Sequence, residues 1–199
     1  MNDFTSLGLG AAASLFFGAA VIQNALLVRA LGLSALFSPN AFDRKPVYCL
    51  QLAAASVGTS LLYSVLSGRL LSHLGFSEYI RPLGVAVCAC VMYAVIMPLS
   101  KAVASKERKQ EAVRCAASAC FNIPVFACAL ITAANHYSLL TTALYALGLC
   151  AGFLIGAMLV AAARRRLNAD SVPAPFRGLP ATLLCLAGMA LGLQALSAA

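Results

Sequence analysis

The sequence predicts an all-α, polytopic membrane protein with six transmembrane helices. Of the 199 residues, 62% are hydrophobic and only 10% are charged, with a mean hydropathy of +0.90, whereas a soluble domain has about 25% charged residues. The apolar residues gather in six runs of a length suited to a hydrocarbon core of about 30 Å. The charged residues lie mostly in the short connections between these runs.

The six predicted spans form a single membrane domain over residues 1–199. They are Leu7–Phe37, Val47–Ser67, Leu83–Val103, Cys115–Ala134, Leu139–Ala163 and Leu179–Leu196. The first run does not read as a signal peptide, because Asp3 stands where a basic region is expected and five more apolar runs follow.

The first span is longer than a bilayer requires and holds polar residues near its middle. As one straight helix it would be about 45 Å long, and it contains Gln23, Asn24, Arg29 and Gly32. Polar side chains at membrane depth are costly and usually mark a pathway, a cofactor site or a helix–helix contact. We therefore expect this helix to be broken. Arg29 is either a counter-charge in an ion path or a side chain that reaches the interface, and the excess length favours the interface.

The fourth span contains Asn122, with Pro124 two residues later. A proline there removes a backbone donor and disfavours helix in the preceding residue, which predicts a second break. Unwound backbone inside a membrane persists only when it is buried in protein or lines a cavity. The two breaks are therefore expected to meet at a midplane polar site formed by Gln23, Asn24, Gly32 and Asn122. The alternative is that the two asparagines only join helices.

The basic residues predict the orientation in the membrane. Eleven Lys and Arg residues lie in the connections after spans one, three and five, against two in the other connections, Arg69 and Arg81. Cytoplasmic loops carry the excess of Lys and Arg. We therefore expect the odd-numbered connections in the cytoplasm and both termini on the extracytoplasmic side of a bacterial plasma membrane.

The spans also divide into two groups of three, at residues 1–104 and 105–199. An odd number of spans per half gives the halves opposite orientations, as in many transport proteins. The pattern apolar-Arg-x-Leu opens span three at Arg81 and span six at Arg177, and Asn24 corresponds to Asn122. These matches predict two inverted three-helix repeats with helices one and four broken.

Residue sets typical of a soluble enzyme's active site are missing from the sequence. The eight cysteines lie in or beside apolar segments without metal-ligand spacing, so they are expected to be packing residues. No paired carboxylates, Ser–His–acid set or phosphate-binding loop is found, and the net charge of +8 is explained by topology rather than by nucleic acid. No independent catalytic site or protein-held metal is expected.

Two stretches resemble a known family. NALLVRALGLS in span one and DSVPAPFRG before span six resemble the RnfA subunit of the Rnf electron-transport complex and its relative NqrE of the sodium-pumping NADH:quinone reductase. The more specific signal is the motif formed by Val172, Pro173, Pro175, Phe176, Arg177 and Gly178. The resemblance implies a homologous partner subunit of opposite topology, like RnfE or NqrD, further complex subunits, and an iron–sulfur cluster shared between the two homologous subunits.

The sequence departs from the family at the implied cluster ligands. Ser34 and Ile123 stand where the family has cysteine, and iron–sulfur clusters are normally held by thiolates. Cys120 and Cys128 lie nearby, so a shifted ligand at Cys120 stays open. The interpretation is a diverged member that binds no cofactor by itself.

Two functions are therefore expected. The first is a membrane subunit of an Rnf/Nqr-type complex that couples electron transfer to Na⁺ or H⁺ translocation, an enzyme only as part of that assembly. The second is an inverted-repeat transporter of ions or small solutes that uses Gln23, Asn24, Ser34 and Asn122.

Overall fold

The structure, a computed structural model, describes residues 9–32, 45–67, 80–103, 109–167 and 178–198, together with Pro173 and Phe176. These parts of the chain are helical and contain no strand, which confirms the predicted all-α class for them. The elements are α1 (Leu9–Phe17), the π-helix η1 (Gly18–Ile22), α3 (Lys45–Leu66), α5 (Arg81–Val103), α6 (Lys109–Cys120), α7 (Ile123–Ala134), α8 (Leu139–Leu167) and α9 (Leu179–Ala198).

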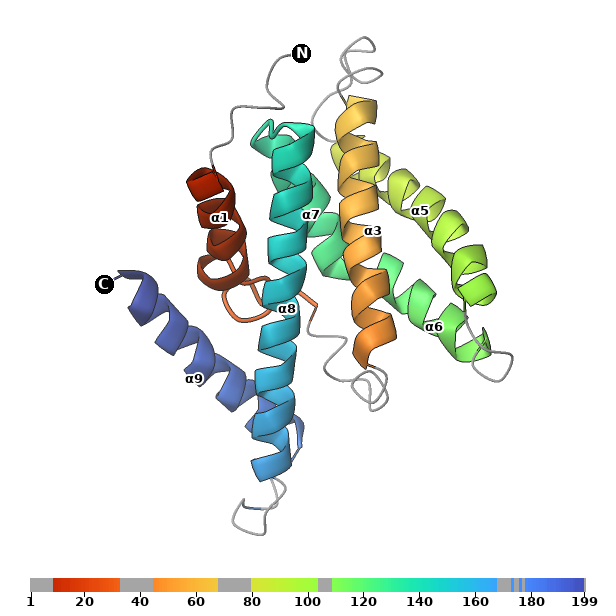
Figure 1. Ribbon diagram of the computed structural model, residues 1–199. Coiled ribbons are helices and arrows are strands. Elements are labelled where there is room, and N and C mark those ends of the chain that lie inside the picture. The colour runs from red at the N-terminus through yellow and green to blue at the C-terminus, as the bar shows by residue number, and fades with distance from the viewer. Residues whose placement is uncertain are drawn as a thin grey trace.

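Helices α3 and α8 form the centre of the molecule (Figure 1). α3 packs against α5, α6, α7 and α8, and α8 packs in addition against α1, η1 and α9. α5 and α6 lie on one side of the central pair, and α1 and α9 lie on the other. Each of the other described helices therefore has at least one of the two central helices as a neighbour.

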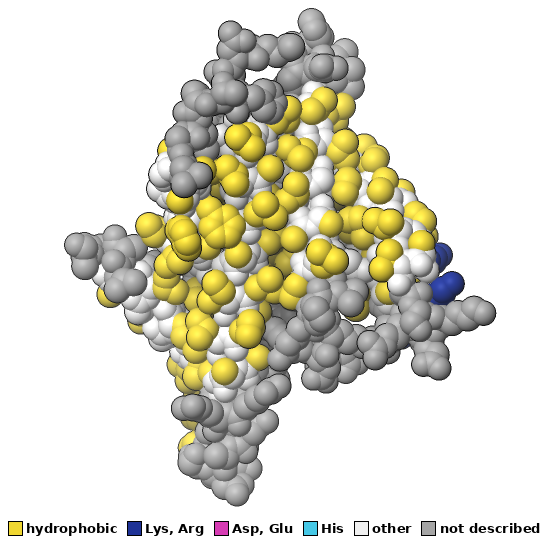
Figure 2. Space-filling model, viewed as in Figure 1, with side chains coloured by type: hydrophobic (Ala, Val, Ile, Leu, Met, Phe, Trp, Pro, Cys, Tyr) yellow, Lys and Arg dark blue, Asp and Glu magenta, His cyan; other side chains and the backbone are white. Residues whose placement is uncertain are grey.

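Four helices in the described chain are long and apolar enough to cross a bilayer, namely Tyr48–Leu66, Arg81–Val103, Ala112–Ala134 and Leu139–Ala163. They correspond to predicted spans two to five. Shorter apolar helices, Gly10–Ile22 and Leu179–Ala195, lie where spans one and six are predicted. The visible surface of the described residues is largely apolar, with basic side chains at the edge beside α5 and α6 (Figure 2). The protein is thus a multi-pass membrane protein.

The helix ends sort the connections to the two ends of the molecule. α3, α6 and α9 begin, and α5 and α8 end, at the lower end in Figure 1. The three basic connections of the sequence leave from these helix ends. Lys101, Lys109 and Arg114, on the facing ends of α5 and α6, are exposed in this region. The fold therefore gathers the basic connections at one end, as topology by charge requires.

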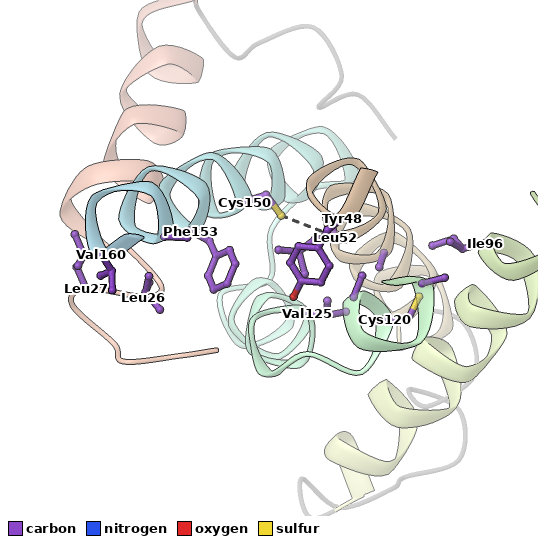
Figure 3. Close-up of a cluster of buried hydrophobic side chains, with 14 of the residues drawn as sticks. Leu26, Leu27, Tyr48, Leu52, Ile96, Cys120, Val125, Cys150, Phe153 and Val160 are labelled. Atoms are coloured by element: carbon purple, nitrogen blue, oxygen red, sulfur yellow. Dashed lines mark hydrogen bonds between the residues drawn. The ribbon is translucent and has the colours of Figure 1, made fainter. Parts of the chain in front are cut away.

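The core is built from small and aliphatic side chains of the central helices. Its largest cluster contains Leu26 and Leu27, which follow η1, with Leu52 on α3, Val125 on α7 and Phe153 on α8 (Figure 3). In lipid there is little hydrophobic gain when one helix packs on another, so dispersion contacts and interhelical hydrogen bonds stabilise the bundle. Alanines and glycines at the contacts allow the backbones to approach closely enough for both.

Candidate functional site

The first helix ends inside the fold. Gln23 closes η1 by donating its backbone N–H to the Gly18 carbonyl at 2.8 Å. One further turn follows, in which the Val28 and Arg29 amides both donate to the Asn24 carbonyl, at 3.0 and 3.3 Å. Ala30 then takes a left-handed conformation with φ +53°. An alanine in this region costs about 1–2 kcal/mol, so the surrounding packing holds the turn in place.

The side chain of Asn24 stabilises this break. Its Oδ1 accepts the amides of Leu26 and Leu27, both at 3.0 Å, as a helix N-cap does. Its Nδ2 donates to the Ala20 carbonyl at 3.0 Å and to the Gly152 carbonyl of α8 at 2.8 Å. Asn24 is only 2% exposed, and the four bonds satisfy its amide fully. They fasten the broken helix to α8.

Glycines on α8 make this approach possible. Gly148, Gly152 and Gly156 repeat every four residues on one face. A Cβ atom at Gly148 would lie 2.6 Å from the Phe16 carbonyl oxygen, and one at Gly152 would overlap the Ala20 carbonyl. At Gly156 it would lie 3.1 Å from a methyl carbon of Leu26. The face of α8 that receives the first break therefore requires glycine.

The second break separates α6 from α7 at Phe121 and Asn122. Asn122 has an extended backbone, with φ −84° and ψ 142°, and its side chain makes no capping bond to α7. Pro124, in the first turn of α7, has no N–H to offer it. Asn122 Nδ2 instead donates to the Tyr48 hydroxyl at 2.7 Å. Its Oδ1 is buried and has no partner among the described residues, although Asn122 is only 4% exposed.

The two breaks touch one another. Gly32, at the end of the first break, has φ +80°. A Cβ atom at this position would lie 2.7 Å from Phe153 Cε2 and 2.9 Å from Pro124 Cγ. Gly32 therefore packs between α8 and the first turn of α7, where only glycine fits both the backbone and the space. The two interruptions of the membrane helices meet at this contact.

The structure places the predicted polar residues in different environments. Asn24, Gly32 and Asn122 are buried, whereas Gln23 is exposed and accepts the Tyr145 hydroxyl at 3.0 Å. Asn24 bonds to α8 and Asn122 bonds to α3. Ser34 lies outside the described residues.

Half of the VPAPFRG motif lies outside the described residues too, namely Val172, Pro175 and Arg177. Pro173 and Phe176 are exposed, and the Phe176 amide donates to the Pro173 carbonyl at 2.9 Å. Gly178 has φ +88° and leads into α9. The described part of the motif is a turn before the last helix.

The residues at the implied cluster positions do not fit an iron–sulfur cluster. Ile123 is 52% exposed, and an isoleucine side chain cannot ligate iron. Cys120 is fully buried in the largest apolar cluster, and Cys128 is buried in a second one, where it accepts the Ser60 hydroxyl at 3.4 Å. Within the described chain, no group of three or more His, Cys, Asp or Glu residues could hold a metal ion. We therefore assign no step to a cluster ligated by the described residues.

Sequence reasoning missed the partners of the two asparagines. Tyr48 and Tyr145 look like ordinary residues of apolar spans, although both hydroxyls bond to polar residues of the breaks. The Gly148, Gly152 and Gly156 repeat is visible in the sequence as glycine at every fourth residue. That spacing is a known signal of close helix approach.

These features define a multi-pass membrane protein whose discontinuous helices meet inside the bundle. No family model matches the chain. The chain is similar to RnfA-type protein of Alkalilimnicola ehrlichii, a component of the ion-translocating oxidoreductase complex, with 38% identity over 71 residues. The matched region covers 36% of this chain and 37% of the relative's length.

Proposed function

We propose that this chain is a membrane subunit of an Rnf/Nqr-type complex that couples electron transfer to Na⁺ or H⁺ translocation. The similarity to a component of an ion-translocating oxidoreductase supports this proposal over about one third of the chain. The apolar helices support placement in a bilayer, as a multi-pass protein of the bacterial plasma membrane with both termini extracytoplasmic.

The contact between the two breaks is the observation that carries the proposal. Gly32 and Pro124 belong to segments about ninety residues apart, yet a Cβ atom on the first would lie 2.9 Å from the second. Interrupted helices that meet inside a bundle are the usual architecture of membrane sites for ions and cofactors. A purely structural bundle gains nothing from two interruptions at one place.

Packing also supports two inverted repeats, at residues 1–104 and 105–199. α3 packs against α6 and α7, and α8, its counterpart, packs against α1 and η1. α5 packs against α3, α6 and α7, and its counterpart α9 packs against α8 and η1. Each helix pair in one half therefore has an equivalent pair in the other, which is what a two-fold axis in the membrane plane produces.

The proposed subunit works without ligating a cluster through Ser34 and Ile123. Its role is to place the two breaks beside a homologous subunit of opposite topology, like RnfE or NqrD, within a larger complex. An iron–sulfur cluster, if the complex contains one at this level, would supply electron transfer from ligands on other chains.

Affinity purification of the tagged chain from its native membranes tests the proposal. We expect co-purification of redox subunits with bound flavin, and Na⁺- or H⁺-coupled NADH or ferredoxin oxidation that is lost when the gene is deleted. Iron and acid-labile sulfide in the isolated chain should be below stoichiometric levels. Purification without any redox subunit would contradict the proposal, and a cluster held by the chain alone would contradict the substituted ligand positions.

Restoring the thiols tests the substituted positions directly. The variant with Ser34→Cys and Ile123→Cys is expected to raise the iron and sulfide content of the purified complex. A matched variant with one added cysteine on the exposed face of α1, Ser14→Cys, should not. Equal iron content in the two variants would contradict the assignment of Ser34 and Ile123.

A second candidate function is an inverted-repeat transporter of ions or small solutes. The buried, unpartnered Oδ1 of Asn122 favours it, because an uncompensated polar atom at a helix break is a natural ligand for a cation or a donor group. This candidate predicts a stable homodimer that moves a solute in liposomes, and that Asn122→Ala lowers the rate. A purified chain that is inactive alone would exclude it.

A further inference from the structure

Arg29 lies close to the middle of the membrane bundle. Asn24 bonds to Gly152, which lies about 20 Å from Leu139 and about 16 Å from Ala163 along the apolar span of α8, at 1.5 Å per residue. The Arg29 amide donates to the Asn24 carbonyl, so the backbone of Arg29 is within one helical turn of that level. About 10 Å of hydrocarbon therefore separates it from either interface, which is longer than an arginine side chain can span.

The Arg29 guanidinium has no hydrogen-bond or ion-pair partner among the described residues. The side chain is exposed, as are the neighbouring Ala30 and Gln23. Its charge lies near the Tyr145 hydroxyl, which donates its proton to Gln23 rather than compensating a cation. A charged side chain facing lipid at this depth costs about 2.5–3.5 kcal/mol or more. The depth of the turn therefore argues against the interface-reaching side chain that the sequence favours.

This chain does not offer a counter-charge at that depth. Its acids are Asp3, Asp43, Glu78, Glu107, Glu111 and Asp170, and each lies near a terminus or in a connection between apolar runs. A second copy of the chain would be equally short of carboxylates inside its spans. The compensating group must therefore come from a different protein.

We propose that Arg29 forms an ion pair with an aspartate or glutamate on a membrane-spanning helix of another protein. That helix covers the exposed surface of the first break at Ala30 and extends to Ile123, beside the Pro124 that Gly32 contacts. Intramembrane carboxylates are found where they face a partner charge, so the partner is recognised by this chemistry. The inference rests on the membrane-subunit part of the proposed function and is independent of the redox reaction.

Neutral and charge-keeping variants of Arg29, produced in the native host, test the proposal. We expect Arg29→Gln and Arg29→Glu to lower the fraction of the chain in its assembled complex at least about tenfold, which corresponds to about 1.4 kcal/mol, with Arg29→Lys much closer to wild type. Arg114→Gln, an exposed arginine near a helix end, is the matched control and should leave assembly unchanged. The melting temperature of each purified chain in detergent separates loss of assembly from loss of folding.

A photo-crosslinker at Ala30 locates the partner residue. We expect crosslinks to a membrane-spanning segment that carries Asp or Glu within one helical turn of the crosslinked position. Exchanging the charges, with Arg29→Glu and the partner acid changed to Arg, should restore the assembly that each single change removes.

Three results would overturn the ion pair. Assembly could be unaffected by Arg29→Gln, Asp43→Asn could reproduce the loss and reveal a pair within the chain, or the Arg29 effect could depend only on anionic lipid in nanodiscs. If the charge exchange works but the complex contains no redox subunit, the ion pair stands and the proposed function fails. If redox subunits co-purify equally with all Arg29 variants, the ion pair fails and the proposed function stands.

Discussion

The two breaks carry an asparagine at equivalent places, but the two side chains do different things. Asn24 makes four hydrogen bonds and leaves none of its amide atoms free. Asn122 makes one, to Tyr48, and its Oδ1 has no partner in the described structure. A buried amide that is fully bonded stabilises a fold, whereas a half-bonded one is available to another group. The comparison indicates that the first break is fixed and that the second is the more open to a ligand or a partner.

The difference comes from the helix that each break faces. α8 presents glycine, so its backbone carbonyl at Gly152 reaches the Asn24 amide directly. α3 presents the longer Tyr48 side chain, which reaches Asn122 with one hydroxyl group. Direct contact with backbone also satisfies donors and acceptors within the break itself, and a side-chain contact does not.

Changing the α8 glycine should have the largest effect on this comparison. Gly152→Ala would force its Cβ into the Ala20 carbonyl, and we expect a loss of about 3 kcal/mol in unfolding free energy. Gly188→Ala on α9, where an added Cβ meets nothing within 4 Å, is the control and should be nearly neutral. Denaturation by SDS in detergent micelles measures both. Similar values would show that the close approach is not what fixes the first break.

Removing the first asparagine should come next. Asn24→Ala leaves the amides of Leu26 and Leu27 and the Gly152 carbonyl without their partner, and we expect a loss of about 2–3 kcal/mol. Ser14→Ala on the exposed face of α1 is the matched change and should cost little. Hydrogen–deuterium exchange should also show faster exchange at Leu26 and Leu27. Unchanged protection there would argue against the capping role.

The contact between the breaks can be divided into strain and overlap. Gly32→Ala adds a Cβ at φ +80° that would also overlap Phe153 and Pro124, and we expect a loss of about 2 kcal/mol. Gly178→Ala adds one at φ +88° with nothing within 4 Å, so it should cost only about 1 kcal/mol. The difference in melting temperature of the two variants measures the overlap. Equal shifts would mean that the breaks are not tightly packed.

The smallest effect is expected at the second asparagine. Asn122→Ala removes one side-chain bond together with an unpartnered acceptor, so we expect a loss of about 0.6 kcal/mol or less. Tyr48→Phe removes the same bond from the other side and should have a similar effect. The double variant should cost little more than either single one. A loss as large as that of Asn24→Ala would contradict the contrast between the two breaks.

Much of the fold follows from the sequence because it depends on local pattern. The apolar runs gave the helices, and Pro124 marked the second interruption through its missing N–H. The partners of the asparagines were not predictable in this way. Tyr48 and Gly152 lie in other spans, and which face of a helix a residue occupies depends on tertiary packing that hydropathy does not encode. For the same reason the exposure of Arg29 at the level of the break could not be read from the length of the first span.

The bond between Asn24 and Gly152 joins residues 128 positions apart, and this has a consequence for biosynthesis. At about 5–20 residues per second, a ribosome needs several seconds to make α8 after the first break has been synthesised. During that interval the Asn24 amide lacks its lasting acceptor. The amino-terminal hairpin must therefore wait for help from water, the insertion machinery or a chaperone before it can settle.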